Sequence, residues 1–441
     1  MDDWLWATAA ELGRGIAAGE IAPEDLAEAY LAAIARHPEA ERIYARVTPD
    51  RARAEAAAAG ARARAGLRRG PLDGVPISWK DLFDTAGVAT EAGTALMRGR
   101  VPARDAEVLR RATDAGLVCL GKTHMSEIAF SGLGLNPVTA TPPNRHDPDA
   151  VPGGSSSGAA ASVAFGLAAA GIGSDTGGSV RIPAAWNDLV GFKTTHGLLP
   201  LDGVVPLCSG FDTVGPLCRS VEDAALLWEA LGGGAVDLRG ATLDGTRMAV
   251  LDTVVGEDLD PGIAAAFDAA LGRLSDAGVA IQRIAWPPLA EAYEIAGPLV
   301  VADAWANWRR LVEADPDAMF DQIRARVSAG AAVPAHVYLE NWSRLRALRG
   351  EYAAATAGFD AVLCPTTAGP APKVAALLAD PELYVAENLR ALRNTRLGNL
   401  MGLCGLTLPT GVPGAGLLLN GAARGEARLL RLGVAAARAL T

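Results

Sequence analysis

The sequence predicts an α/β fold, because short apolar, strand-like runs alternate with helical segments along most of its 441 residues. A strand-like run at 117–120 follows a helical pattern at 105–114, and strand-like runs at 248–251 and 279–284 flank a helical segment at 262–277. Hydrophobic residues make up 50% of the chain and charged residues 20%, so the chain can bury a large core and is not disordered.

The N-terminal part of the chain is predicted to be helical up to roughly residue 65. Pro23 begins a helix with an acidic first turn and an apolar face that includes Leu26 and Tyr30. Thr48 is expected to be the N-cap of a second helix. A turn then leads into a short strand that ends at Lys80.

The rest of the chain continues this alternation. Residues 121–158 are rich in Gly, Pro, Asn and Ser and are predicted to be mostly loop. The glycine-rich stretch 232–245 is a weak internal boundary. The further predicted elements are an alanine-rich helix at 159–170, a strand at 170–174, a largely helical stretch at 287–357, a strand at 360–364, a helix at 385–400, strands at 405–409 and 416–419, and a final helix.

Composition excludes several classes of function. The formal net charge of -10 argues against a dedicated nucleic-acid binder and against anchoring on anionic lipid. Five scattered cysteines and the absence of a secretory signal predict a reduced, cytoplasmic protein. Five dispersed histidines without an HExxH pattern predict no metal site. Residues 151–174 carry no charge, but their Gly, Ala and Ser content predicts a buried helix rather than a membrane span.

Two matches to well-known motifs are expected to be accidental. Residues 116–123 match the phosphate-loop pattern GxxxxGK[ST], but the interior is an apolar strand and the helix lies before it instead of after it. Residues 154–158 match the nucleophile elbow GxSxG, but a loop stands where the elbow needs an apolar strand.

Lysine is scarce, which draws attention to the four that are present. Only Lys80, Lys122, Lys193 and Lys373 are lysines among 40 basic residues. A serine nucleophile needs a base, and a buried lysine can serve because desolvation lowers its pKa, whereas arginine stays charged. Lys80 ends an apolar segment, so it is either such a base or a remnant of a composition biased towards arginine.

Two serine-containing turns complete the candidate site. In residues 174–183, two glycines before Ser179 would let backbone amides converge as in an oxyanion hole, or would form a turn that caps the helix starting near Pro183. Residues 153–158 offer a second serine-rich turn. Since a helix and a strand separate the two turns, they can fold back onto one another.

At these turns the sequence closely resembles the amidase signature family. The matching segments are dense from about residue 70 to residue 230, at 71–81, 121–127, 152–158, 173–183, 191–197 and 212–223. The resemblance implies a large mixed β-sheet sandwiched between helices on both faces. It also implies one domain over 1–441, with N-terminal helices at 1–68, a signature core at 69–230, and a helical insert with the C-terminal part of the sheet at 231–441.

The resemblance implies a Ser-cisSer-Lys triad. Ser179 matches the nucleophile, Ser155 the bridging serine on a cis peptide, and Lys80 the base. Backbone amides would form the oxyanion hole, and three side chains would support the site. The implied oxyanion residues are Thr176, Gly177, Gly178 and Ser179, and the supporting residues are Asp175, Arg181 and Ser156.

The implied activity is hydrolysis of the C–N bond of a small linear amide, without a cofactor or metal and without nucleic-acid or membrane partners; a homodimer is left open. Three alternatives stay open: an esterase or carbamate hydrolase with the same triad, the glutaminase subunit of a tRNA-dependent amidotransferase, and a non-catalytic member. Residues 131–136 and the short C-terminal end favour a stand-alone amidase. The segment from Trp186 to Asp188 and the compressed stretch 406–421 depart from the family pattern, so pocket specificity is not carried over.

Overall fold

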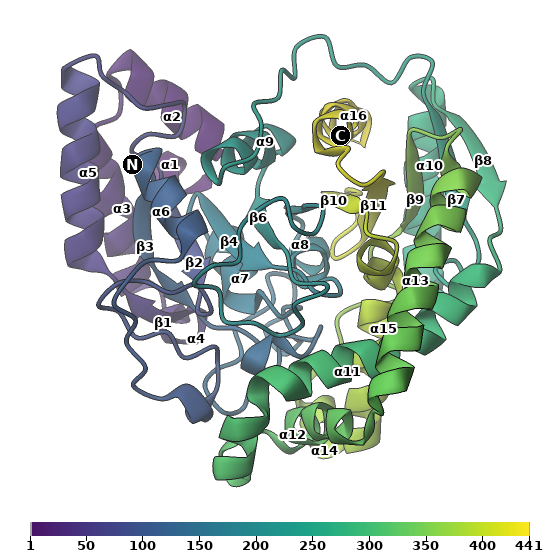
Figure 1. Cartoon of the computed structure of the whole chain (residues 1–441). Coiled ribbons are helices and arrows are strands. Elements are labelled where there is room, and N and C mark those ends of the chain that lie inside the picture. Colours follow the sequence, from purple (N-terminus) through teal and green to yellow (C-terminus); the bar gives the residue numbers. More distant parts are fainter. Residues whose placement is uncertain (1, 441) are drawn as a thin grey trace.

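The computed structural model describes residues 2–440. An eleven-stranded mixed sheet forms the centre of the fold (Figure 1). The strand order is β1-β3-β2-β4-β6-β5-β10-β11-β9-β7-β8. The strands are β1 (Tyr44–Val47), β2 (Pro76–Lys80), β3 (Val118–Thr123), β4 (Ala170–Ser174), β5 (Val190–Lys193), β6 (Val214–Cys218), β7 (Arg247–Leu251), β8 (Ala280–Ile284), β9 (Ala361–Pro365), β10 (Cys404–Pro409) and β11 (Gly416–Gly421).

The sheet joins the two halves of the sequence. Strand β2 runs parallel to both β3 and β4, and β7 runs parallel to both β8 and β9. Between these groups the C-terminal strand β10 pairs antiparallel with β5, with Gly405 opposite Lys193. The predicted α/β class with a large mixed sheet is therefore confirmed, while the division into a signature core and a C-terminal part stays a prediction.

Helices pack against the sheet and against one another. Helix α7 contacts β2, β4 and β6, α8 contacts β5 and β10, and α16 contacts β10 and β11. The helices are α1 (Asp2–Trp6), α2 (Ala9–Ala18), α3 (Pro23–Arg36), α4 (Ala40–Ile43), α5 (Pro49–Arg64), α6 (Glu107–Asp114), α7 (Ser157–Ala164), α8 (Arg181–Trp186), α9 (Val221–Ala230), α10 (Pro261–Asp276), α11 (Pro288–Ala314), α12 (Asp321–Ser328), α13 (Ala335–Thr356), α14 (Val374–Ala379), α15 (Pro381–Leu400) and α16 (Glu426–Leu440).

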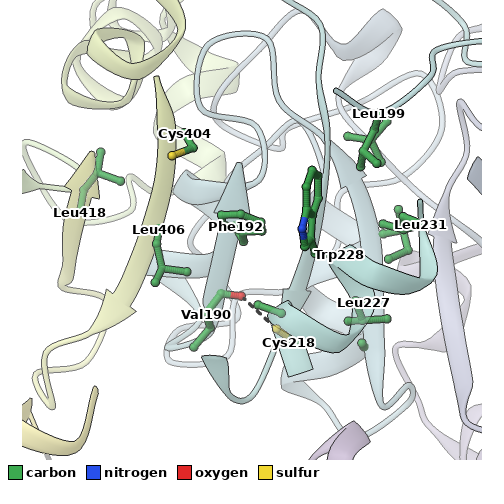
Figure 2. Packing of buried hydrophobic residues seen from close by; sticks show 14 of the residues in the cluster. Val190, Phe192, Leu199, Cys218, Leu227, Trp228, Leu231, Cys404, Leu406 and Leu418 are labelled. Atoms are coloured by element: carbon green, nitrogen blue, oxygen red, sulfur yellow. Dashed lines mark hydrogen bonds between the residues drawn. The ribbon is translucent and has the colours of Figure 1, made fainter. Parts of the chain in front are cut away.

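Side-chain alternation along β5 and β6 shows that helices cover both faces of the sheet. Leu217 of β6 packs among residues of α7 and α8, including Ala159 and Ala184. On the opposite face, Phe192 of β5 meets Trp228 of α9 edge to face, with ring centroids 6.2 Å apart, and Cys218 lies beside them (Figure 2). Because neighbouring strand residues point to opposite faces, this pattern places the sheet between two helical layers.

Several predicted boundaries differ from the observed ones. Helix α7 begins at Ser157 and ends at Ala164, not at 159 and 170, because Gly166 adopts a left-handed conformation (φ 71°) that stops the helix. Thr48 does precede α5, but its hydroxyl donates to the carbonyl of Cys119 at 3.0 Å and caps no helix amide.

Strands β1, β5 and β6 and helix α9 were not among the predicted elements. Strand β6 contains Pro216, which cannot donate to a ladder and is typical of edges. The strand is nevertheless internal, since β4 pairs with it over residues 214–217 and β5 pairs with it only at Leu217 and Cys218. Within the described residues, no helix is long and apolar enough to cross a membrane.

Candidate active site

Lys80 is the last residue of β2, and its side chain is fully buried. Its ammonium nitrogen lies 2.6 Å from the hydroxyl oxygen of Ser155 and 2.8 Å from that of Ser174, and donates to both. Burial lowers the pKa of Lys80 to about 7, and the negative charges of Asp175 and Asp212 offset only part of this effect. Near neutral pH the amine is therefore partly unprotonated.

The two serine-rich turns do fold onto one another. Helix α7 and strand β4 lie between them in sequence, and the amide of Ser156 donates to the carbonyl of Ser179 at 3.2 Å. The hydroxyl of Ser156 donates to the carbonyl of Ser174, also at 3.2 Å, which ties the first turn to the end of β4. The peptide bond between Gly154 and Ser155 is cis.

A buried ion pair braces the turn that carries Ser179. The carboxylate of Asp175 accepts from Nε and Nη2 of Arg181 at 3.0 and 2.8 Å, and from the amides of Gly178 and Val180 at 2.8 and 3.1 Å. Burial alone would raise the pKa of Asp175, but the charge and hydrogen bonds of Arg181, with smaller effects of Lys193 and Asn399, together hold the pKa well below its usual range. Asp175 is therefore ionised and shapes the turn.

The backbone amides of the turn divide into two groups. The Gly178 amide is used by Asp175, so it is not directed at a substrate. Within residues 2–440, the amides of Thr176, Gly177 and Ser179 donate no hydrogen bond. These three amides are available to a developing oxyanion, whereas the Gly178 amide, which was also expected in the oxyanion hole, donates to Asp175 and holds the turn.

The turns that carry Ser155 and Ser179 are joined by the hydrogen bond from the Ser156 amide to the Ser179 carbonyl, but among the described residues no hydrogen bond joins the two hydroxyl groups. Ser179 is 4% exposed, and its side chain lines a cavity. Because apo active sites commonly have loose catalytic hydrogen bonds, this geometry is compatible with a relay that closes on substrate.

Residues far from the recognised turns complete the site, and sequence reasoning did not single them out as site residues. Asp212, at the end of the loop before β6, accepts from the hydroxyl of Thr176 at 2.5 Å, and burial raises its pKa to about 6. Asn399 and Thr395 of α15 contact Arg181: the Asn399 side-chain oxygen and the Thr395 carbonyl each accept from it at 2.6 Å. Asp212 begins a segment that matched the family, whereas Asn399 and Thr395 carried no sequence signal.

The cavity beside Ser179 has a volume of about 210 Å³ and a mostly apolar wall. Helices α11, α12 and α15 contribute much of the wall, with Val300, Val301 and Leu392 among its apolar residues. The charged residues in the wall are Arg326 and Arg396. The cavity can therefore hold a small ligand whose carbonyl carbon meets the Ser179 hydroxyl.

The other buried lysines differ from Lys80. Lys122 forms an ion pair with Asp81 at 3.0 Å, and Lys193 donates to the carbonyls of Thr194 and Leu403. Burial lowers the pKa of Lys193 to about 8, but neither its contacts nor those of Lys122 include a serine. Of these three buried lysines, Lys80 alone contacts serine hydroxyl groups.

Trp186, which departs from the family pattern, fills the core. Its side chain is buried beside Val151 and Leu133, and its indole nitrogen donates to the carbonyl of Gly369 at 3.2 Å. It does not line the cavity beside Ser179. Among residues 2–440, no group of three or more His, Cys, Asp or Glu side chains is arranged to hold a metal ion.

Comparison with known proteins supports a family assignment. A family model described as Amidase matches residues 25–430. The chain is 37% identical to 2-amino-5-chloromuconic acid deaminase of Comamonas testosteroni, over 86% of this chain and 84% of that protein. It is 35% identical to a glutamyl-tRNA(Gln) amidotransferase subunit of Anaeromyxobacter sp. (strain K), over 98% of this chain and 94% of that protein.

Solved structures agree along nearly the whole chain. The crystal structure of an amidase superposes with a TM-score of 0.88 at 32% identity, covering 97% of this chain and 98% of that one. The native peptide amidase from Stenotrophomonas maltophilia superposes with a TM-score of 0.83 at 29% identity, covering 98% and 96%. The chain therefore belongs to the amidase signature family and is an amidohydrolase of that family.

Proposed function

We propose that this protein hydrolyses the C–N bond of a small carboxylic amide through an acyl-enzyme on Ser179. The observation that carries the proposal is the contact of 2.6 Å between Lys80 and Ser155 at a fully buried amine whose pKa burial lowers to about 7. A general base works best when its pKa lies near the working pH, and Lys80 meets that requirement without a histidine.

Acylation begins with proton transfer along the three side chains. Neutral Lys80 takes the hydroxyl proton of Ser155 while Ser155 takes that of Ser179, and the Ser179 oxygen attacks the amide carbon. The amides of Thr176, Gly177 and Ser179, which have no partner within residues 2–440, stabilise the resulting oxyanion. The C–N bond then breaks as the proton returns through Ser155 to the leaving amine.

Deacylation repeats these proton transfers with water. A water molecule gives a proton to the same relay and attacks the acyl-enzyme, which releases the carboxylic acid and restores Ser179. Asp175 and Arg181 act as positioning residues, because they hold the Ser179 turn and touch no reacting atom. Esters and carbamates would pass through the same acyl-enzyme, so the panel used in the test includes them.

A second candidate is the glutaminase step of an amidotransferase. The observation in its favour is the 35% identity to an amidotransferase subunit over 98% of this chain. This candidate requires glutaminase activity of the chain together with a companion protein. Co-purification of such a companion from the source cells, with glutamine turnover that depends on it, would favour this candidate over the stand-alone amidase.

Mass spectrometry of the intact protein after quenching tests the proposal. Incubation with a panel of small amides, esters and carbamates should add the mass of the acyl group, and peptide mapping should place it on Ser179. The Lys80→Ala variant should form the adduct orders of magnitude more slowly, whereas Lys373→Ala should behave like the parent, since Lys373 is exposed and pairs with Asp147. An adduct on another residue, or equal rates in Lys80→Ala, would overturn it.

A further inference from the structure

Two arginines line the cavity beside Ser179 without a carboxylate partner. Arg326 belongs to α12 and Arg396 to α15, so the fold brings them together from segments 70 positions apart. Within residues 2–440, neither guanidinium forms an ion pair, and the ionisable groups that act on them are Arg396 and Tyr384 for Arg326, and Tyr293 for Arg396. The cavity therefore carries positive charge that the described protein does not neutralise.

Arg396 is the less satisfied of the two. Its Nε is buried and has no hydrogen-bond partner among the described residues. Its stem passes the Ser179 turn, since a Cβ atom placed on Gly177 would lie 3.5 Å from its Cγ. The guanidinium carbon lies 5.2 Å from the ring centroid of Tyr293, so an aromatic face supports the charge without neutralising it.

Arg326 is held in place but keeps free donors. Its Nη1 donates to the carbonyl of Phe130 at 2.8 Å, and its guanidinium carbon lies 4.2 Å from the centroid of the Phe130 ring. Burial, together with the positive charge of Arg396, lowers the pKa of Arg326 to about 10. An anion between the two guanidinium groups would relieve this repulsion.

Two other deeply buried arginines are held by several partners, and Arg68 and Arg273, whose buried Nε atoms also lack a partner, donate through their Nη atoms to backbone carbonyls. Arg181 pairs with Asp175 and also donates to Thr395 and Asn399. Arg219 donates to five backbone carbonyls. Leaving a buried guanidinium group without hydrogen-bond partners costs free energy. A ligand bound in the cavity could supply the partners that Arg396 lacks.

We propose that Arg326 and Arg396 bind a carboxylate of the substrate, so that the enzyme prefers small amides that carry a second, anionic end. This inference rests on the proposed function, because it takes Ser179 as the point where the amide carbonyl binds. Guanidinium groups bind carboxylates through paired, charge-assisted hydrogen bonds. The apolar wall formed by Val300, Val301 and Leu392 would contact the short hydrocarbon between the two ends.

The test measures binding in a protein that cannot turn over. The Ser179→Ala variant is titrated with monoamides of the unbranched dicarboxylic acids from malonamate to adipamate, and with the partner of each in which a methyl group replaces the carboxylate. At one chain length at least, the carboxylate compound should bind at least tenfold more tightly than its neutral partner. In Ser179→Ala/Arg396→Gln this ratio should fall at least tenfold.

Control variants separate charge from packing. Arg396→Lys, which keeps the positive charge, should retain part of the preference, whereas Arg326→Gln should lose much of it. Arg324→Gln on the same helix should leave the ratio unchanged, since Arg324 pairs with Asp321 and does not line the cavity. Equal binding of charged and neutral amides at every chain length, or an unchanged ratio in Arg396→Gln and Arg326→Gln, overturns the inference.

Failure of this inference is distinguishable from failure of the proposed function. If the protein with Ser179 intact is acylated by neutral amides or esters but shows no charge preference, the proposed function stands and the carboxylate site falls. If the binding preference is present but no acyl group forms on Ser179, the anion site stands and the proposed chemistry falls. Circular dichroism of each variant verifies that its loss is not a loss of folding.

Discussion

The ammonium nitrogen of Lys80 lies 2.6 Å from the hydroxyl oxygen of Ser155, and both side chains are completely buried. Burial holds the pKa of the lysine near 7, so a group that is normally charged becomes available as a base. The same burial affects two measurable properties, namely the pH dependence of catalysis and the pH dependence of stability.

Catalysis should follow the titration of Lys80. The active form carries the neutral amine, so kcat/KM for a small amide should rise about tenfold per pH unit below pH 7 and level off above it. A steady-state profile from pH 5 to pH 9, with stability checked at each pH, measures this. A profile that is flat through this range, or that falls as the pH rises to 8, would contradict the role of Lys80.

Stability should show the matching effect in the Lys80→Met variant. The unfolded lysine titrates near 10.5 and the folded one near 7, so between these values the unfolded state binds the extra proton. The cost of burying Lys80 is therefore fully present below pH 7 and disappears as the pH rises towards 10.5. Lys80→Met should be inactive yet more stable than the parent, by roughly 1–2 kcal/mol at pH 6, since two lost hydrogen bonds offset part of the gain.

Urea unfolding at pH 6, 8 and 10 measures this difference. The gap between Lys80→Met and the parent should be largest at pH 6 and should shrink at pH 10. Lys373→Met, at an exposed lysine, is the matched control and should show no such gain at pH 6. A gap that grows with pH would mean that Lys80 is not buried as a neutral amine.

The buried pair of Arg181 and Asp175 should be essential for folding of the Ser179 turn. Replacing Arg181 with Met leaves the Asp175 carboxylate buried without its cation, which typically costs about 3–5 kcal/mol. Urea unfolding should show this loss, while replacement of exposed Arg239, which pairs with Asp237 at the surface, should leave the free energy of unfolding nearly unchanged. A similar cost in both variants would argue against the bracing role.

Replacement by alanine should affect the thermal stability differently at the adjacent Gly177 and Gly178. Gly178 has a φ of 140°, and an added Cβ would lie 2.1 Å from the Thr395 hydroxyl oxygen, so Gly178→Ala should lower Tm by several degrees. At Gly177 the nearest atom to an added Cβ is 3.5 Å away, which is an ordinary contact. Differential scanning calorimetry should find Gly177→Ala close to the parent in Tm; equal losses would be inconsistent with this turn geometry.

Arg396 should lower the stability of the free enzyme. Because its buried Nε has no partner among residues 2–440, Arg396→Met should raise the free energy of unfolding by roughly 1 kcal/mol. Arg62→Met is the contrast, since Arg62 pairs with buried Asp73 and its removal should destabilise. Thermal unfolding without ligand compares the two, and destabilisation by Arg396→Met would mean that the guanidinium has a structural role.

The sequence was informative where a short segment carries the chemistry by itself. Lys80 ends a buried strand, and Ser155 and Ser179 lie on glycine-rich turns separated by one helix and one strand, so their meeting was predictable. The wall of the cavity was not, because Arg326 and Arg396 come from helices that pack there only in the folded chain. Strand β6 was not predicted, because it contains Pro216, which is not typical of an internal strand; Pro216 lies opposite Ile172 of β4, outside the stretch that pairs with β5.

The most direct test of the central claim is intact-protein mass spectrometry after rapid quenching with a small ester or amide. One acyl group per chain, mapped to Ser179, should form quickly at pH 8 and orders of magnitude more slowly in Lys80→Ala. An acyl group on any other residue, or one that forms at the same rate without Lys80, would contradict it.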